Sequence, residues 1–522
     1  MRFPSRFVAL LLAVALSACA PIRPATELPR QASHALADPA QTRLGQAVQR
    51  VGNGRPDESA FRLLDNGMEA FLLRMAMCDV AEHTLDVQYY IYQDDKTGRL
   101  FTDALLRAAD RGVRVRVLVD DLGLTRSADL IALDQHPQVE VRSYNPFTWR
   151  SNTAVRVLNG FKEGIRLNRR MHNKSFIVDN ALAIIGGRNI GDEYFHASPE
   201  RDFNDIDLAI AGPLVPQISV SFDDYWNSAH AYPIAFLGLR AEGGDLDMLR
   251  HDLAQHRHNV SDSEWSRALR ETRLARQLYE RSLRFIWAPA ELVVDVPDKV
   301  VQGLDRDREH PVAAIYRHAR AAEREFTIMS PYFIPGEAGS EFLVELAQRG
   351  IDVNVLTNSM QATDVAAVFA GYSPYRKPLL QGGVQVYEFK PRGGREADDQ
   401  QRLFSSSLAS LHSKAFVVDR RTVVITSLNL DPRSVNLNTE LAVIVHSEEL
   451  AERVVRRFEI ASDPANSFRL ALEGDLTGKR PGRGGIVWID ADSQPHYSEP
   501  GVSRWRRALV RMLSWLPIES QL

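Results

Sequence analysis

Two copies of one short motif stand out in this chain of 522 residues. The first copy reads His172-Asn-Lys-Ser-Phe-Ile-Val-Asp179 and is followed by Gly186-Gly-Arg-Asn189. The second copy, 240 residues later throughout, reads His412-Ser-Lys-Ala-Phe-Val-Val-Asp419 and is followed by Thr426-Ser-Leu-Asn429. Composition alone predicts only about 0.03 chance matches to His-x-Lys-x₄-acid. The two copies therefore mark a duplicated unit with a shared function.

The residue types in the motif favour chemistry at a phosphorus atom. Residues i and i+2 of a strand share a face, so His172 and Lys174 point together, as do their second copies. One imidazole can attack phosphorus and the other can protonate the leaving oxygen, while lysine and asparagine stabilise the developing charge. Only eight of the 63 basic residues are lysines, which favours a compact point charge at both sites. The candidate catalytic residues are His172, Lys174, Asp179, Asn189, His412, Lys414, Asp419 and Asn429.

A metal site is the alternative use of these histidines and aspartates. A lysine two residues from each histidine opposes a bound cation, and an aspartate seven residues after histidine is poor spacing for a direct ligand. We therefore expect neither a metal nor another cofactor.

The same order of predicted elements surrounds both motifs, which indicates an internal repeat. In each copy a helix leads into an apolar strand, and a second helix ends at Arg-Gly before another strand. The glycines, Gly112 and Gly350, suit the left-handed conformation that ends a helix. Apolar strands alternating with helices predict an α/β fold with two similar domains on largely buried sheets. We expect a first domain over 55–240, a helical connector over 241–300, a second domain over 301–472 and a tail over 473–522.

The duplicated motif resembles the signature of the phospholipase D superfamily. Further stretches resemble its bacterial cardiolipin synthase branch, in particular the C-type synthases; they are 89–98, 111–120, 330–335 and 513–519. This resemblance implies two α/β domains in a pseudo-two-fold arrangement with one shared active site, a phosphohistidine intermediate and no metal. It also implies that His172 is the nucleophile and His412 the general acid and then base. For the acid that orients each histidine, it points to Glu440 in the second half and to either Asp205 or Asp207 in the first.

The N-terminus has the three parts of a secretory signal. Arg2 and Arg6 precede an apolar run of about ten residues, too short to span a bilayer, and small residues follow. The ending Leu16-Ser-Ala-Cys19 resembles a bacterial lipobox, which implies removal of 1–18 and acylation of Cys19. We expect a tether over 19–54 and a periplasm-facing lipoprotein. Ala20 favours the outer membrane over the inner membrane by resemblance to lipoprotein sorting rules.

The substrate class is narrowed by charge and by the predicted anchor. A formal net charge of −4 argues against a nucleic acid partner, and an acylated chain favours phospholipids at a membrane surface. The function that the resemblance implies is a phosphatidyltransferase making cardiolipin from phosphatidylglycerol and a second phospholipid, with phosphatidylethanolamine as one choice of donor. A phospholipase D-type hydrolase releasing phosphatidic acid is the alternative, ahead of a nuclease or an inactive lipid-binding scaffold. Candidate residues for binding the substrate phosphate are Gly187, Arg188, Ser427, Arg169 and Arg170.

The C-terminal tail contains a basic amphipathic stretch over 503–516. Arg506, Arg507 and Arg511 can meet anionic headgroups while tryptophan, leucine and methionine side chains dip inward. A helix docked on the protein's own core explains the same pattern. The sequence leaves both interpretations open.

Overall fold

The computed structural model describes residues 24–124, 127–147, 164, 166–239, 244–305, 307–391, 409–477, 482, 484–515 and 521. Residues 1–18 and Cys19, on which the predicted signal peptide and acylation depend, lie outside them. Within the described part of the chain, no helix combines the length and apolar character needed to cross a bilayer.

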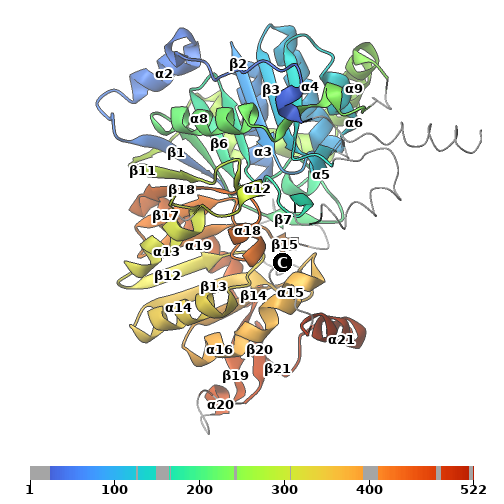
Figure 1. Ribbon diagram of the computed structural model, residues 1–522. Coiled ribbons are helices and arrows are strands. Elements are labelled where there is room, and N and C mark those ends of the chain that lie inside the picture. The colour runs from blue at the N-terminus through green and yellow to red at the C-terminus, as the bar shows by residue number, and fades with distance from the viewer. Residues whose placement is uncertain are drawn as a thin grey trace, which may run out of the picture.

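The first half of the chain, which ends at Ala288, is built on a nine-stranded sheet of order β10-β1-β8-β6-β5-β2-β3-β4-β9 (Figure 1). Its central strands β2, β3 and β4 run parallel, and β5 pairs antiparallel to β2. The strands are β1 (Ser59–Leu64), β2 (Thr84–Tyr89), β3 (Arg114–Asp120), β4 (Val139–Tyr144), β5 (Ser175–Val178), β6 (Leu182–Gly186), β8 (Asp207–Ala211), β9 (Ala231–Pro233) and β10 (Ile286–Ala288).

The second half, which begins at Ala290, repeats this order in a ten-stranded sheet, β11-β18-β17-β16-β12-β13-β14-β19-β20-β21. From β11 to β19 each strand occupies the place of a first-half strand from β1 to β9, so the predicted duplication and the α/β class are confirmed. The strands are β11 (Ala290–Val294), β12 (Glu325–Met329), β13 (Asp352–Asn358), β14 (Gln385–Phe389), β16 (Ala415–Val418), β17 (Thr422–Thr426), β18 (Leu441–His446), β19 (Ser467–Leu472), β20 (Ile486–Ile489) and β21 (Pro495–His496).

Helices cover the outer face of each sheet. The first half uses α3 (Gly67–Val80), α4 (Lys96–Asp110), α5 (Asp121–Leu124) and α6 (Ala128–Leu133), and the second uses α13 (Pro311–Arg320), α14 (Gly336–Gln348), α15 (Ala366–Tyr372) and α16 (Arg376–Gln381). Helix α4 and helix α14 both end before a glycine with positive φ, Gly112 at 92° and Gly350 at 87°, as the Arg-Gly pairs predict.

A third hydrophobic core joins the two halves. It is formed by residues of both sheets together with α8 (Leu214–Asn227) and α19 (Glu448–Ser462). Two backbone links tie the halves together beside this core. The short strands β7 (Asp202–Asn204) and β15 (Ala409–Leu411) pair in parallel, and Met171 forms a bridge with Thr439.

The structure divides the chain differently from the expected domains. The region predicted as a connector holds α9 (Leu246–Ser261), α10 (Glu264–Glu271) and α11 (Arg273–Tyr279), which pack on α4 and α3 of the first half. Strand β10 extends the first sheet and β11 begins the second, so the boundary is at Pro289 and the predicted one at 300 is wrong. The reason is that apolar residues after 285 pair with sheet edges in both directions.

The segments predicted as tether and tail also belong to the folded body. Buried arginines bind the backbone of the first: Arg142 donates to Gln31 O at 3.0 Å and Arg116 to Ser33 O at 2.7 Å. Helix α2 (Arg43–Val51) follows in that segment. In the tail, β20 pairs with β19, α20 (Glu473–Thr477) follows β19, and α21 (Arg504–Leu513) forms within the predicted amphipathic stretch, so part of the tail extends the second sheet.

Candidate active site

His172 lies just before β5 and is held by the other half of the chain. Its backbone N–H donates to Thr439 O at 2.9 Å, and its Nδ1 lies 3.0 Å from both carboxylate oxygens of Glu440. Glu440 immediately precedes β18 in the sequence, and its side chain is fully buried. The imidazole therefore has one nitrogen fixed by a carboxylate and leaves Nε2 for chemistry.

His412 is held in the same way, with the halves exchanged. Its backbone N–H donates to Asn204 O at 2.8 Å, and its Nδ1 lies 2.5 Å from Asp205. The expectation that each acid orients the histidine of its own half is therefore wrong. The acids cross because β7 lies beside β15, while Thr439 bridges to Met171, so each acid follows a segment paired with the opposite motif.

Asp207 does not orient a histidine. It lies two residues after Asp205, accepts a hydrogen bond from Arg74 at 2.9 Å and forms an ion pair with Arg188. All three side chains are buried. Asp207 therefore balances buried arginine charge behind the site, and Asp205 reaches the imidazole.

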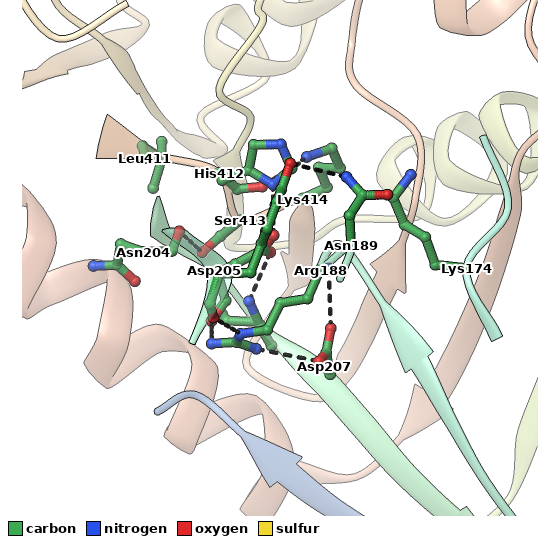
Figure 2. A network of polar contacts seen from close by, with 12 residues as sticks. Lys174, Arg188, Asn189, Asn204, Asp205, Asp207, Leu411, His412, Ser413 and Lys414 are labelled. Carbon is green, nitrogen blue, oxygen red and sulfur yellow. Dashed lines mark hydrogen bonds and ion pairs between the residues drawn. The ribbon is translucent and has the colours of Figure 1, made fainter. Parts of the chain in front are cut away.

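The two motif lysines lie buried beside the histidines, each about 1% exposed. Lys174 Nζ donates to His172 O at 2.6 Å, and Lys414 Nζ donates to His412 O at 2.7 Å. Figure 2 shows Lys174 and Lys414 reaching the same region as the His412 ring, with Asn189 next to them. Burial lowers the pKa of Lys174 to about 7, with Glu440 opposing that shift, and burial also lowers the pKa of Lys414.

The two imidazoles are close enough to influence one another. Burial lowers the pKa of His172 well below its ordinary value, and the charges of Lys174, Lys414 and His412 lower it further. Burial and Lys414 also lower the pKa of His412, but Asp205 opposes them by charge and by a hydrogen bond. His172 is thus neutral at neutral pH, whereas His412 has a partner that favours its protonated form.

The two orienting carboxylates differ in charge. Burial raises the pKa of Glu440 to about 8, against the opposing effects of Lys174, Ser427 and Lys299. Burial alone would also raise the pKa of Asp205, but His412, Lys414 and Arg188 together lower it. The carboxylate beside His412 is therefore the more firmly ionised of the two.

The two motif asparagines have different surroundings. Asn189 Oδ1 accepts from the backbone N–H of Ile91 at 3.1 Å, and its Nδ2 donates to Tyr194 Oη at 2.9 Å. Asn429 is 5% exposed, and the described residues offer its Oδ1 no hydrogen-bond donor. The second asparagine therefore has a polar atom left for a group that enters the site.

The two motif aspartates are held away from the histidines, at the far ends of β5 and β16. Asp179 accepts three backbone hydrogen bonds of 2.8–2.9 Å from residues 82–84, and Asp419 accepts three of 2.8–3.0 Å from residues 323–325. Both have positive φ, 50° and 53°, in tight turns to the next strand. The two aspartates fix the strands that follow the histidines. The geometry therefore gives them a structural role and not a catalytic one.

The predicted phosphate-binding residues mostly hold the protein together. Arg188 donates to the carbonyl oxygens of Leu64, Tyr194 and Asp205, and Arg170 donates to Asp120 and to Asn145 O. Both are about 1% exposed, so neither guanidinium serves the phosphate site that the sequence predicted. Arg169 is half-buried and donates to Val301 O at 2.8 Å, and its predicted contact with phosphate stays a prediction.

Gly187 and Ser427 occupy equivalent positions and act on the orienting acids. A Cβ on Gly187 would lie 2.3 Å from Asp205 Oδ1, so only glycine lets this carboxylate approach. Ser427 Oγ instead donates to Glu440 at 2.5 Å and accepts from the N–H of Leu441 at 3.1 Å. Both residues therefore position a carboxylate, which the sequence did not predict.

Sequence reasoning missed a pair of residues behind the histidines. Asp120 Oδ2 accepts from the N–H of Met171 at 3.1 Å, and Asn358 Oδ1 accepts from the N–H of Leu411 at 2.9 Å. Each sits at the carboxyl end of an equivalent strand and holds the residue just before a histidine. The signal that was available is a polar residue ending the same buried strand in both copies.

A second missed group lies behind Glu440. Asp295 accepts from the N–H of Glu440 at 3.0 Å and from Lys299 Nζ at 2.7 Å, and it bonds His310 Nδ1 at 2.6 Å. These residues pack beside the site, but no three histidine, cysteine or acidic side chains in the described part of the chain are grouped as a metal site requires.

Comparison with known proteins agrees with this geometry. The family model described as "Cardiolipin synthase, PLD-like domain" matches residues 75–226 and 315–461. The chain belongs to this family. Each matched segment contains one histidine motif, one orienting acid and the helix, α8 or α19, that packs in the core joining the halves.

Proteins named cardiolipin synthases match most of the chain. It is 38% identical to cardiolipin synthase C of Escherichia coli K12, over 91% of this chain and 99% of that protein. It is 26% identical to cardiolipin synthase 1 of Bacillus anthracis, over 80% of this chain and 69% of that protein. The crystal structure of a phosphatidylserine synthase from Haemophilus influenzae superimposes with a TM-score of 0.58 at 13% identity, covering 91% of this chain and all of the other, which supports the fold.

Proposed function

We propose that this protein is a phosphatidyltransferase that joins a phosphatidyl group to phosphatidylglycerol and so makes cardiolipin. The observation that carries the proposal is one site built by both halves, in which two imidazoles, each oriented by the other half's carboxylate, face two buried lysines. The 38% identity to a cardiolipin synthase over nearly the whole chain supports this choice of substrate.

In the first step, Nε2 of neutral His172 attacks the phosphorus of a donor phospholipid. The P–O bond to the headgroup alcohol breaks, and the protonated His412 gives its proton to the leaving oxygen. The phosphatidyl group is then bound to His172 as a phosphohistidine. Lys174 and Lys414, buried beside the two imidazoles, can stabilise the charge that builds up on the phosphoryl oxygens.

In the second step, His412 acts as the base. It takes the proton of a hydroxyl of phosphatidylglycerol, whose oxygen attacks phosphorus while the P–N bond to His172 breaks. The asymmetry of the carboxylates supports these roles, because an ionised Asp205 favours the protonated form of His412, whereas His172 stays neutral and nucleophilic.

Product analysis tests the transferase. Purified enzyme is incubated with labelled phosphatidylglycerol, alone and with phosphatidylethanolamine, and the lipids are measured by mass spectrometry. We expect cardiolipin and a released headgroup alcohol, and no turnover by the His172→Ala variant. Phosphatidic acid as the sole product would mean that water is the acceptor and that the protein is a hydrolase.

We also propose that the chain is a lipoprotein acylated at Cys19 after loss of residues 1–18, and that it faces the periplasm from the outer membrane. The bound segment supports a short link, because Arg30 donates to Ser228 O on the folded body. Eleven residues reach at most about 40 Å, which keeps the body near the membrane. Mass spectrometry of the mature N-terminus, with a Cys19→Ser control, should show acyl chains on Cys19; an unmodified Cys19 would contradict the anchor.

A further inference from the structure

Helix α21 is attached to the body by one of its faces. Ser503 Oγ accepts from the N–H of Arg506 at the start of the helix, and Val510 is buried against α15. The Arg506 guanidinium donates to Thr363 O at 3.0 Å. Figure 1 shows α21 standing at the side of the second half, next to α15. These contacts agree with one of the two interpretations that the sequence leaves open, a helix docked on the protein's own core.

The face of α21 beside the docked one presents large apolar side chains to solvent. Trp505 is 87% exposed, Met512 53% and Leu509 45%, and Trp515 just beyond the helix is 79% exposed. Positions 505, 509 and 512 are spaced by four and three residues, so they form one stripe along the helix. Isolated exposed apolar residues are ordinary, but a stripe of three, with a second exposed tryptophan just beyond the helix, marks a surface for contact.

The charged residues of the helix itself have one sign. Arg504 and Arg511 are exposed and Arg507 is half-exposed, while residues 503–515 contain no aspartate or glutamate. Arginine beside tryptophan and leucine is the composition of helices that lie in the interface of anionic bilayers, with the rings at headgroup depth. The charge is complementary to phosphatidylglycerol-containing membranes.

The helix is also close to the candidate active site. Thr363, which accepts from Arg506, precedes Asp364, and the carboxylate of Asp364 accepts from Tyr332 Oη at 2.9 Å. The charge of Asp364 reaches Lys414, whose pKa it raises. Helix α21 is therefore attached to a segment whose next residue, Asp364, acts electrostatically on Lys414.

We propose that α21 is a membrane-docking helix. Trp505, Leu509 and Met512 insert into the interface of an anionic bilayer, Arg504 and Arg511 contact phosphate headgroups, and the active site is brought against the surface from which it draws lipid. The value of this placement for catalysis depends on the proposed phosphatidyltransferase function, but the binding itself does not.

Vesicle binding tests the proposal in the full chain carrying Cys19→Ser, which cannot be acylated. The vesicles contain phosphatidylcholine alone or phosphatidylcholine mixed with phosphatidylglycerol. We expect binding to the mixed vesicles, a loss of at least about ten-fold in Trp505→Ser/Leu509→Ser/Met512→Ser, and about five-fold for each of Arg504→Gln and Arg511→Gln. The matched control is Tyr279→Ser, a 91% exposed residue on α11, which should bind as the parent does.

Three further measurements separate the outcomes. The triple variant should keep its melting temperature and its turnover of lipid in detergent micelles, while His172→Ala should bind vesicles as the parent does. A triple variant that binds vesicles as well as Tyr279→Ser overturns the proposal. So does a parent that ignores vesicles and whose dimer dissociates in the triple variant, because a second copy would then cover the stripe.

Discussion

The His172 and His412 sites are built to one plan, and the differences between them separate their chemistry. His172 faces a glutamate whose burial raises its pKa to about 8, while His412 faces an aspartate whose pKa is lowered by His412, Lys414 and Arg188 despite burial. The residue beside each acid differs as well: Ser427 donates to Glu440, whereas Gly187 makes room for Asp205. A duplicated motif thus supplies two imidazoles whose protonation is set by the opposite half.

The groups behind the acids explain this difference. Asp205 is backed by Arg188, which donates to its carbonyl oxygen, and a cation there favours the charged carboxylate. Behind Glu440 the charge of Lys299 is paired with Asp295, and burial remains the largest influence on the pKa of Glu440, which it raises. A nucleophile needs a neutral imidazole and a general acid needs a protonated one, so the comparison favours the proposed roles, His172 as nucleophile and His412 as general acid.

Removing either imidazole is expected to have the largest effect on activity. We expect His172→Ala to abolish transfer with every donor, because no group is left to carry the phosphatidyl moiety. His412→Ala should lose about 10² to 10⁴ in kcat/KM with a natural donor and recover much of its first step with a donor whose leaving group is p-nitrophenol, which needs no proton. Burst kinetics with the two donors measure this. Equal rescue of both variants would contradict the assignment.

The crossed acids are the next test. We expect Asp205→Asn and Glu440→Gln each to lower kcat/KM by about 10² to 10⁴, because an amide cannot orient and stabilise the imidazole as a carboxylate does. Asp205→Asn should make the rate steeply dependent on the pKa of the leaving group, as the acid His412 is weakened. Glu440→Gln should leave that dependence unchanged. The reverse pattern would restore the pairing of each acid with its own half.

The pH dependence of kcat/KM is a further test of the difference between the two sites. Lys174, with a pKa of about 7, must be charged to stabilise phosphoryl oxygens, so activity falls as pH rises through that value. In its charged form Glu440 raises this pKa, so Glu440→Gln should move the alkaline limb of kcat/KM to lower pH, by less than about one unit because Glu440, with a pKa of about 8, is largely protonated near pH 7. Asp205 and Asp207 also raise the pKa of Lys174, so Asp205→Asn should move the limb in the same direction, to lower pH.

The motif aspartates give the smallest effect on activity. Asp179→Ala leaves three backbone N–H groups without their acceptor and should lower the free energy of unfolding by roughly 1–3 kcal/mol. The kcat of the folded fraction should stay within about two-fold of the parent, because the side chain touches no reacting group. Calorimetry and active-site titration measure the two quantities. A large fall in kcat with unchanged stability would return Asp179 to the catalytic set.

The second motif aspartate, Asp419, is expected to make a contribution to stability that depends on pH. Burial would raise the pKa of Asp419, but the N–H groups of residues 323–325 lower it below its ordinary value. Because the pKa is lower in the folded state, the charged Asp419 stabilises the fold at pH values above its unfolded pKa, near 3.8. This stabilisation is lost as the pH falls through the pKa of the folded state. The difference in stability between the parent and Asp419→Asn should therefore narrow below about pH 4.

The sequence predicts what is periodic or repeated. The duplicated motif, the alternation of apolar strands with helices and the Arg-Gly helix ends are local patterns, and they lead to the two α/β halves that the structure contains. The placement of Glu440 was not accessible in this way. Which histidine an acid faces depends on the pairing of β7 with β15 and of Met171 with Thr439, contacts between segments more than 200 residues apart.

Charge was the other source of error. Arg170 and Arg188 are cationic residues next to the first motif, which favoured contact with phosphate, but both are buried and bound to carbonyl and carboxylate groups of the protein. Local sequence cannot separate a buried structural arginine from a ligand-binding one, because the two differ only in what the fold places around them. Similarly, Asp179 and Asp419 share a motif with the histidines and not their location.

The most direct test of the crossed site is to find which histidine carries the phosphatidyl group. The His412→Ala variant is mixed with a p-nitrophenyl phosphatidyl donor, quenched under alkaline conditions that preserve phosphohistidine, digested and mapped by mass spectrometry. We predict a phosphatidyl adduct on His172, and none on that peptide in the double variant with Glu440→Gln at the same reaction time. An adduct on any other residue, or turnover without an adduct, would contradict the account.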